Sequence, residues 1–309
     1  MTIQHRVLVT GASGFVGGEI YRYLLDSGYE TIGLTKNNKN QNEDFYYFDL
    51  EDIDSNKKYF RNITTLVHCA ARVHISKEGD GSDFFKINVK GTFDLLLAAK
   101  KNNIRNFIYI STTAVYGLDS CNDLICQSST VFPRTEYAKS KLEAENLVSE
   151  YCEINDINFL IIRCPMIYGR NAPGNFRALF DFSNSNKPII KSFNQSVRSF
   201  LYVKNLVDFI SLSIKESNYS STVIISDSKD MSVSDFMCKI RKRLKPKCTM
   251  CFLYLPKFLL CTIFVSMNRK KIYLNLFCDF RIEKNIYSGQ IDWIPPYSLD
   301  DALEDICNI

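Results

Sequence analysis

The stretch Arg6-Val-Leu-Val-Thr-Gly-Ala-Ser-Gly-Phe-Val-Gly17 decides the fold. Its first five residues form a short run rich in β-branched side chains, which is typical of a buried strand. The motif Gly11-x-x-Gly14-x-x-Gly17 follows directly, and Ile20 and Leu24 then recur at helical spacing. Glycines between a strand and a helix let the backbone approach a pyrophosphate, whose charge is met by free N–H groups and the positive end of the helix. The expected ligand is therefore a dinucleotide.

The alternation of strand and helix continues through the first half of the chain. Apolar runs predict strands at 31–34, 65–69, 107–111 and 159–163, and helical spacing predicts helices at 84–100 and 135–153. Strands that are nearly all apolar and alternate with long helices are typical of a parallel sheet covered on both faces. The predicted fold class is α/β, with a Rossmann-type doubly wound parallel sheet.

The rhythm changes after about Gly169. Residues 171–186 are rich in Asn, Gly, Pro and Ser, which predicts a loop region leading into a different unit. A further strand is expected at 222–226 and a helix at 234–244. We therefore expect a dinucleotide-binding Rossmann domain at 1–170 and a smaller, mixed α/β substrate-binding region at 171–309. The chain is expected to cross between the two, with a cleft where they meet.

The composition indicates an ordinary globular protein and excludes several classes. Of 309 residues, 46% are hydrophobic and 23% are charged, which excludes disordered, collagen-like and coiled-coil chains. The net charge of +4 is too small and too scattered for a nucleic-acid partner. Eleven cysteines at irregular spacing, with no secretory leader recognised, indicate reduced thiols and a cytoplasmic protein. The three histidines are too dispersed for a metal site, and His68 is expected to be a core residue.

The most apolar stretch, Cys251 to Met267, has two interpretations. Pro256 and Lys257 interrupt it, and it is shorter than the ~20 apolar residues that a transmembrane helix needs. A core helix followed by a solvated basic turn is the favoured interpretation. The alternative is a peripheral contact with a membrane, aided by the basic run 269–271, and with it a lipid-linked sugar substrate.

The residues at the end of the second strand bear on the choice of dinucleotide. An acidic residue there would bind the adenosine ribose of NAD, but this chain has Thr35-Lys36. A hydroxyl followed by a lysine accommodates a 2′-phosphate, so NADP(H) is favoured and NAD(H) is the alternative. Lys36 could instead be a solvated loop residue. Asp49 follows the next apolar run, where its carboxylate would accept from the adenine amino group.

Two further segments carry chemistry. In Tyr137-Ala-Lys-Ser-Lys141 the tyrosine and the second lysine lie four residues apart on one helical face, so the ammonium is expected to lower the phenol pKa and make Tyr137 an acid or base. Ser111-Thr-Thr-Ala-Val-Tyr-Gly117 ends a parallel strand at the edge where ligands bind in α/β sheets. Its Thr112 hydroxyl would hydrogen-bond a substrate oxygen beside Tyr137.

These three segments, in this order, resemble the extended short-chain dehydrogenase/reductase (NAD-dependent epimerase/dehydratase) family, whose members act on nucleotide sugars. The resemblance covers almost the whole chain and includes five further segments: Asn88 in Asn-Val-Lys-Gly-Thr, Arg163-Cys-Pro-Met-Ile-Tyr-Gly169, Gly174-Asn-Phe176, Arg198-Ser-Phe-Leu-Tyr-Val203 and Asp292-Trp-Ile-Pro-Pro-Tyr-Ser-Leu299. It implies a catalytic group of Thr112, Tyr137 and Lys141. It also implies that Asn175 and Arg198 hold the sugar and diphosphate of the substrate.

Together, the motifs and the resemblance give a set of expected site residues. The substrate is expected to contact His74, Thr112, Thr113, Asn175 and Arg198. The cofactor is expected to contact Gly11, Ser13, Gly14, Phe15, Val16, Gly17, Thr35, Lys36, Asp49, Leu50, Ala70, Ala71, Asn88, Tyr137, Lys141 and Pro165.

Within the family, the loop Ala70-Ala-Arg-Val-His74 and the tail look most like bacterial O-antigen enzymes that reduce a UDP-4-keto-6-deoxy sugar to UDP-N-acetylquinovosamine, and like UDP-sugar 4-epimerases. The missing acidic residue places reduction ahead of epimerisation. Sugar 4,6-dehydratases carry an acidic pair after the catalytic threonine, whereas this chain has Thr113 and Ala114, so dehydration is disfavoured. A non-catalytic dinucleotide sensor is a minor alternative. Relatives pair through two helices, so a homodimer through 84–100 and 137–152 is expected.

Overall fold

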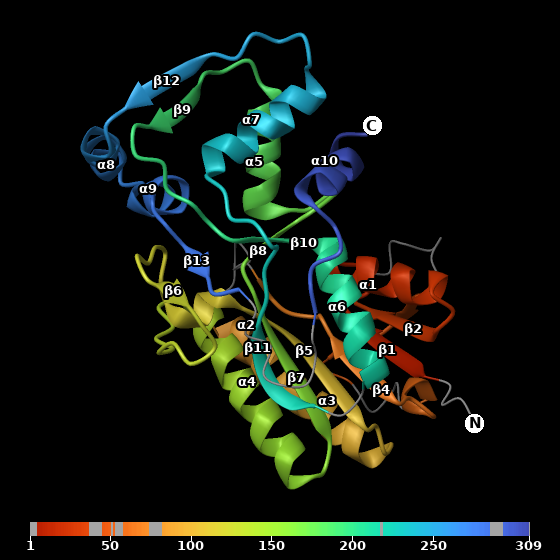
Figure 1. The fold of residues 1–309 in the computed structure, drawn as a ribbon. Coiled ribbons are helices and arrows are strands. Elements are labelled where there is room, and N and C mark those ends of the chain that lie inside the picture. Colours follow the sequence, from red (N-terminus) through yellow and green to blue (C-terminus); the bar gives the residue numbers. More distant parts are fainter. Residues whose placement is uncertain are drawn as a thin grey trace.

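A parallel sheet of seven strands organises the protein (Figure 1). The computed structural model describes residues 5–36, 45–50, 52, 58–73, 82–216, 219–284 and 293–308. The strands lie in the order β11-β7-β5-β4-β1-β2-β3, and every neighbouring pair is parallel. This confirms the predicted fold class. The bounds are β1 Arg6–Thr10, β2 Glu30–Thr35, β3 Phe45–Tyr47, β4 Thr65–His68, β5 Asn106–Thr112, β7 Asn158–Cys164 and β11 Ser220–Ile224.

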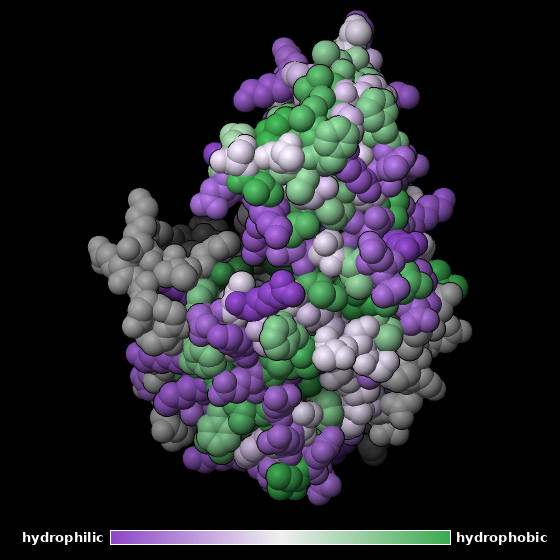
Figure 2. Space-filling model, turned by 90° about the vertical axis from the view of Figure 1, so that its left-hand side faces the viewer, coloured by the Kyte–Doolittle hydropathy of each residue, from purple (hydrophilic) through white to green (hydrophobic). Residues whose placement is uncertain are grey.

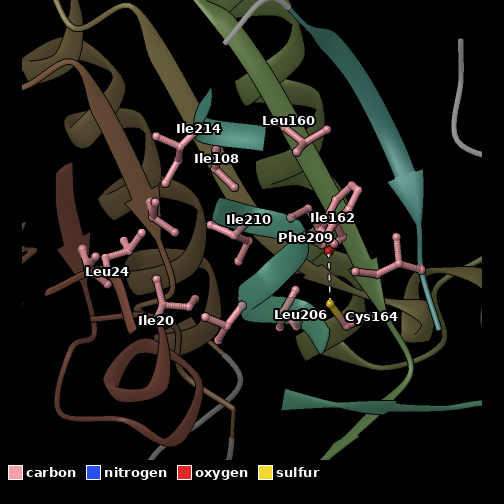
Figure 3. Close-up of a cluster of buried hydrophobic side chains, with 14 of the residues drawn as sticks. Ile20, Leu24, Ile108, Leu160, Ile162, Cys164, Leu206, Phe209, Ile210 and Ile214 are labelled. Carbon is pink, nitrogen blue, oxygen red and sulfur yellow. Dashed lines mark hydrogen bonds between the residues drawn. The ribbon is translucent and has the colours of Figure 1, made fainter. Parts of the chain in front are cut away.

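Alternate side chains of the strands pack into two cores, one on each face of the sheet. On one face, Val7 and Val9 join α1 (Phe15–Asp26) and α6 (Val203–Glu216). Figure 3 shows Ile20 and Leu24 of α1 beside Leu206 and Ile210 of α6, in one cluster with side chains of β5 and β7. On the other face, Leu8 joins α3 (Gly91–Lys101) and α4 (Glu136–Ile154). The sequence alternation therefore produces a sheet that is covered on both sides, as parallel sheets require.

The helix expected at 84–100 is present with a change in its first half. A turn of helix α2 (Ser82–Phe84) is followed by a π-helical segment, Phe85–Lys90, which continues into α3. Asn88 lies in the π-helical segment and is buried. Such wide turns often occur at functional sites.

The chain returns to the sheet after leaving it. β8 (Met166–Tyr168) pairs with β10 (Phe200–Tyr202), α6 follows, and β11 then adds to the edge of the main sheet beside β7. The strand expected at 222–226 thus begins two residues earlier. The other elements are β6 Leu124–Ile125 paired with β13 Arg281–Ile282, β9 Ile189–Ser192 paired with β12 Phe252–Leu255, and the helices α5 Gly174–Asn184, α7 Val233–Leu244, α8 Lys257–Ser266, α9 Lys270–Phe277 and α10 Leu299–Cys307.

Two sequence predictions for the second half are wrong. Residues 171–186 contain helix α5, not only a loop, because Phe176 packs into a buried cluster with α7 and the helix supplies that contact. The stretch 251–267 is not a core helix. It divides at Pro256 into β12 and α8, and Leu260 is the one residue of α8 that is buried.

Two observations concern the apolar stretch and the cysteines. Among the described residues, none of the helices has both the length and the apolar character needed to cross a membrane.

All eleven cysteines are free thiols in the structure.

The contact between α6 and the C-terminal tail provides a test of the core. Phe209 is fully buried, and its ring lies 5.1 Å from that of Trp293. We expect Phe209→Ala to lower the free energy of unfolding by about 3–5 kcal/mol, because it leaves a cavity that the sheet cannot fill. Denaturant unfolding measures the effect. Phe132, whose side chain is exposed, is the control: Phe132→Ala is expected to change stability by less than about 0.5 kcal/mol, and equal losses would contradict the assignment.

Candidate active site

The glycine motif forms a tight turn between β1 and α1. Gly11 has φ +71°, and the Gly14 N–H donates to the Gly11 carbonyl at 2.9 Å. A Cβ atom on Gly17 would lie 2.3 Å from the same carbonyl oxygen, so only glycine fits there. Ser13, Gly14 and Phe15 line a small cavity at the beginning of α1, together with Arg22 and Arg170. The predicted pyrophosphate site thus has the required backbone geometry, with Val16 packed against the core.

The residues predicted at the adenosine end contact one another. Thr35 is buried at the end of β2, and its hydroxyl hydrogen-bonds that of Ser13. The Lys36 ammonium lies 2.8 Å from the Asp49 carboxylate. The charge of Lys36 is therefore partly balanced within the chain, which the sequence did not indicate. Leu50, next along, packs beneath Gly91 at the start of α3.

The loop after β4 is held close to the glycine turn. Ala70 approaches so closely that a Cβ on Gly11 would lie 2.8 Å from its nitrogen. The Asn88 side chain binds the backbone of Arg72 twice, accepting from its N–H at 2.7 Å and donating to its carbonyl at 3.1 Å. It also donates to Ser140 at 3.0 Å. Asn88 thus fixes the course of the Ala70-Ala71 loop and joins it to α4. His74 lies outside the described residues.

Thr112 and Tyr137 lie close together where β5 ends and α4 begins, and Lys141 follows one turn along α4. Thr112 is the last residue of β5, and Thr135 caps α4 by accepting from the Ala138 N–H at 3.2 Å. This places Tyr137 in the first turn of α4, within hydrogen-bonding reach of the Thr112 hydroxyl. One turn later, Lys141 is 3% exposed and donates to the Ile110 carbonyl at 2.7 Å. The structure therefore places Thr112 and Tyr137 together, while the Lys141 ammonium binds the backbone of β5.

The pKa values of this group differ from the sequence prediction. Burial raises the pKa of Tyr137 to about 12, and the hydrogen bond with Thr112 lowers it by less. Burial also lowers the pKa of Lys141 to about 8, against the opposing effect of Glu145. The expected lowering of the Tyr137 pKa by Lys141 is thus wrong in this structure. The reason is geometric, because the ammonium contacts the Ile110 carbonyl and lies 4.0 Å from the centre of the Tyr109 ring.

A buried ion pair joins α4 to the sheet next to Lys141, and the sequence analysis did not predict it. Glu145 is 3% exposed and pairs with Arg163 of β7, with Nη2 and Oε2 2.7 Å apart. It also accepts from Ser111 of β5, while Arg163 donates to the Tyr116 hydroxyl at 3.0 Å. Tyr137, Lys141 and Glu145 follow one another at intervals of four, so helical spacing could have revealed the third member.

A cavity of about 630 Å³ lies beside Thr112, between the carboxyl edge of the sheet and the C-terminal elements. Five predicted residues line it: Thr112, Thr113, Pro165, Asn175 and Arg198. Lys271 and Asn275 of α9 also line it, and the sequence did not assign them to the site. The volume lies in the range of pockets for small organic ligands.

Arg198 is half-buried and lines this cavity from the C-terminal half. Its Nη1 donates to the carbonyls of Asp119, Leu274 and Cys278 at 3.0–3.1 Å, and the guanidinium lies 4.9 Å from the centre of the Phe280 ring. Burial lowers its pKa to about 10, so it stays protonated at neutral pH. Arg198 therefore brings a positive charge to the cavity and ties α9 to the loop after β5.

The histidines and acidic residues provide no metal centre in the described part of the chain. No group of three His, Cys, Asp or Glu side chains there is placed to hold an ion. His68 is buried, with ring nitrogens 2.7 Å from the Thr10 hydroxyl and 3.0 Å from that of Thr92. Burial lowers its pKa to about 3, which confirms it as a neutral core residue.

The chain resembles sugar 4-epimerases in sequence and in fold. It is 29% identical over 75% of its length to a UDP-glucose 4-epimerase of Vibrio cholerae, covering 73% of that protein. It is 27% identical to the N-acetyl-α-D-glucosaminyl-diphospho-ditrans,octacis-undecaprenol 4-epimerase of Escherichia coli O157:H7, over 96% of this chain and 93% of the relative. The structure superimposes on UDP-glucuronic acid 4-epimerase from Bacillus cereus in complex with NAD, with a TM-score of 0.76, 22% identity and coverage of 98% and 97%.

The family assignment rests on the larger part of the chain. Residues 7–224 match the family model described as "NAD dependent epimerase/dehydratase family", and they include the glycine turn, Thr112, Tyr137 and Lys141. The homologues are enzymes that act on sugar nucleotides or on related lipid-linked sugars. The protein is therefore a member of the NAD-dependent epimerase/dehydratase family, an enzyme with the extended short-chain dehydrogenase/reductase fold.

Proposed function

We propose that the protein is a 4-epimerase for a hexose or N-acetylhexosamine that is joined through a diphosphate to a uridine or polyprenyl carrier. The observation that carries the proposal is the position of Tyr137 beside Thr112, with Thr112 lining the 630 Å³ cavity and Lys141 one turn along α4. The relative that spans 96% of this chain is a 4-epimerase by name, as is the Vibrio cholerae relative. Arg198 and Lys271 face the cavity as counter-charges for the diphosphate.

The three residues have distinct roles in this proposal. Tyr137 takes the proton from the sugar O4 when C4 is oxidised and returns it when C4 is reduced, while Thr112 hydrogen-bonds the same oxygen. The glycine turn from Gly11 to Gly17 would hold a nicotinamide cofactor, which would supply the reversible two-electron redox chemistry at C4. The Lys141 ammonium, which donates to the Ile110 carbonyl in the structure, would have to turn towards Tyr137 to stabilise negative charge on it during the transfer. Turning the C4 ketone between the two steps inverts the centre, so there is no net oxidation.

The positions after Thr112 favour epimerisation over dehydration. Elimination of water needs an acid and a base beside the catalytic threonine, whereas Thr113 and Ala114 offer no carboxylate. Both residues line the cavity, so the difference lies where the sugar would bind.

Reduction of a 4-keto sugar to UDP-N-acetylquinovosamine is the second candidate. It is favoured by Thr35-Lys36, because a carboxylate is absent at the end of β2 and NADP(H) could be accommodated there. The ion pair of Lys36 with Asp49 weakens this argument, since the lysine is already paired. The preference for NADP(H) over NAD(H) stays a prediction, as does a homodimer through α3 and α4, whose support is the exposed Phe93 and Leu97 of α3.

The two candidates differ in their need for added cofactor. We expect the purified protein to interconvert the C4 epimers UDP-GlcNAc and UDP-GalNAc, or their polyprenyl-diphosphate counterparts, without added dinucleotide. An epimerase regenerates its cofactor in each turnover, whereas a reductase consumes one equivalent. Chromatography of the sugars with parallel absorbance at 340 nm, the usual readout for reduced nicotinamide, measures both quantities. Stoichiometric NADPH oxidation on a 4-keto-6-deoxy sugar, without epimerisation, would support the reductase instead.

Burial of Lys141 predicts an opposition between stability and activity. The pKa of Lys141 in the fold, about 8, lies below the usual 10.5. Burying the charged ammonium therefore lowers the free energy of unfolding at pH 7, and this loss disappears as the pH rises from 8 to 10.5. We expect Lys141→Met to raise the free energy of unfolding at pH 7 by about 1–3 kcal/mol while abolishing turnover. Urea unfolding between pH 7 and 10 measures the first effect.

Lys139 is the matched control, since it is an exposed lysine on the same helix. Lys139→Met is expected to change stability by less than about 0.5 kcal/mol and to leave turnover unchanged. If Lys141→Met were strongly destabilised at pH 7, the hydrogen bond to Ile110 would outweigh the burial penalty and the argument would be wrong.

A further inference from the structure

Helix α8 is apolar on every side but is not enclosed by the protein. Its sequence, Lys-Phe-Leu-Leu-Cys-Thr-Ile-Phe-Val-Ser, has no charged residue after Lys257. Leu260 is its one buried residue, whereas Phe258 is 72% exposed and Val265 48% exposed. A helix that is hydrophobic all round is normally found in a core or in a membrane. The exposed faces of α8 therefore require a partner other than water.

Neighbouring strands extend this exposed region. Phe252 and Tyr254 of β12 are exposed, and the ring of Tyr254 stacks on that of Phe193 with centroids 6.2 Å apart. We define the apolar surface as Phe193, Phe252, Tyr254, Phe258, Ile263 and Val265. In Figure 1, α8 and β12 form the outer left edge of the upper lobe, and Figure 2, seen from that side, shows hydrophobic side chains gathered in the upper part of the face.

The segment that carries most of this surface, residues 236–278, has basic residues and no acidic one, although Asp235 pairs with Lys191 beside Phe252. Ten of the 38 Lys and Arg residues and none of the 34 Asp and Glu lie between Phe236 and Cys278. Three of the ten, Arg269, Lys270 and Lys271, follow α8 directly and are exposed. Six of the ten lie in α7 or just after it, where Arg241 is buried, whereas Lys257, Arg269, Lys270 and Lys271 belong to α8 or follow it. An apolar surface with a basic border is complementary to an anionic lipid bilayer.

We propose that the apolar surface docks into the interface of an anionic lipid bilayer. The aromatic and aliphatic side chains would enter the boundary between headgroups and acyl chains, while Arg269 and Lys270 bind lipid phosphates. At ten residues, α8 is about 15 Å long, half the thickness of a bilayer core, so it lies in the interface and does not span it.

Docking in this orientation brings the active-site cavity to the membrane. Phe264 of α8 and Lys271 and Ile272 of α9 line the same cavity as Thr112. A sugar diphosphate could then reach Thr112 while its carrier lipid remains in the bilayer. This consequence rests on the proposed function and favours the polyprenyl carrier over uridine. The docking itself does not depend on it.

Co-sedimentation of the full-length protein with vesicles tests the docking. We expect binding to phosphatidylcholine vesicles that contain ~30% phosphatidylglycerol, and much weaker binding to phosphatidylcholine alone, because the basic residues add to the apolar contribution. Phe258→Gln is expected to weaken partitioning by about 10-fold or more. Arg269→Gln combined with Lys270→Gln is expected to weaken it by about 10- to 30-fold.

Matched controls carry the same changes elsewhere. Ile154→Gln, at a residue 81% exposed at the far end of α4, and Lys100→Gln with Lys101→Gln on α3 are expected to bind like wild type. The proposal is overturned if wild type ignores anionic vesicles, or if the controls lose as much binding as the test variants. It is also overturned if Phe258→Gln dissociates an oligomer in vesicle-free solution, because a second copy would then cover the surface.

Membrane docking and catalysis can fail separately. Tyr137→Phe leaves the apolar surface intact, so it is expected to sediment with vesicles like wild type. Unchanged melting temperatures of all variants exclude misfolding as the cause of lost binding.

Discussion

The burial of charge beneath helix α4 is the constraint on which the site depends. Glu145 and Lys141 lie on the face of α4 that packs against β5 and β7, and Arg163 and Ser111 of those strands bind Glu145. Leaving any of these partners alone in the core would cost several kcal/mol, so the helix is held in one register on the sheet. That register sets Tyr137 beside Thr112. Burial of Lys141 lowers its pKa and costs stability, and it holds an ammonium one turn along α4 from Tyr137.

The second half of the chain completes the site from above. Arg198 ties the loop after β5 to α9 through three carbonyls, and α9 and α8 close the cavity that begins at Thr112. The same two helices carry the exposed apolar and basic residues. A single lobe therefore provides a wall of the cavity and the surface proposed to meet the membrane. This arrangement connects the chemistry of the cavity to the kind of carrier that its substrate has.

Residue spacing predicted those parts of the fold that depend on neighbouring residues in the sequence. The strand and glycine turn at residues 6–17 and the pair Tyr137 and Lys141 depend on spacing along one element, and the structure has them as expected. Helix α5 was not predicted because its polar composition resembles that of a loop. Its structure is determined by the burial of Phe176 against α7. The surroundings of α8 could not be predicted, since hydropathy does not reveal whether an apolar residue finds a partner. The hydrogen bonds from Arg198 to carbonyls about eighty positions away could not be predicted either, because residue spacing along the sequence reports only local contacts.

The central claim is that Tyr137 carries the proton at the sugar O4. Its most direct test is the turnover of Tyr137→Phe, with bound dinucleotide measured on the same sample. The account predicts a loss of about 10²- to 10⁴-fold in kcat with the cofactor still bound, because the ring is retained and only the ionisable hydroxyl is removed. A variant that keeps full activity would contradict the account and move the acid–base role to another residue.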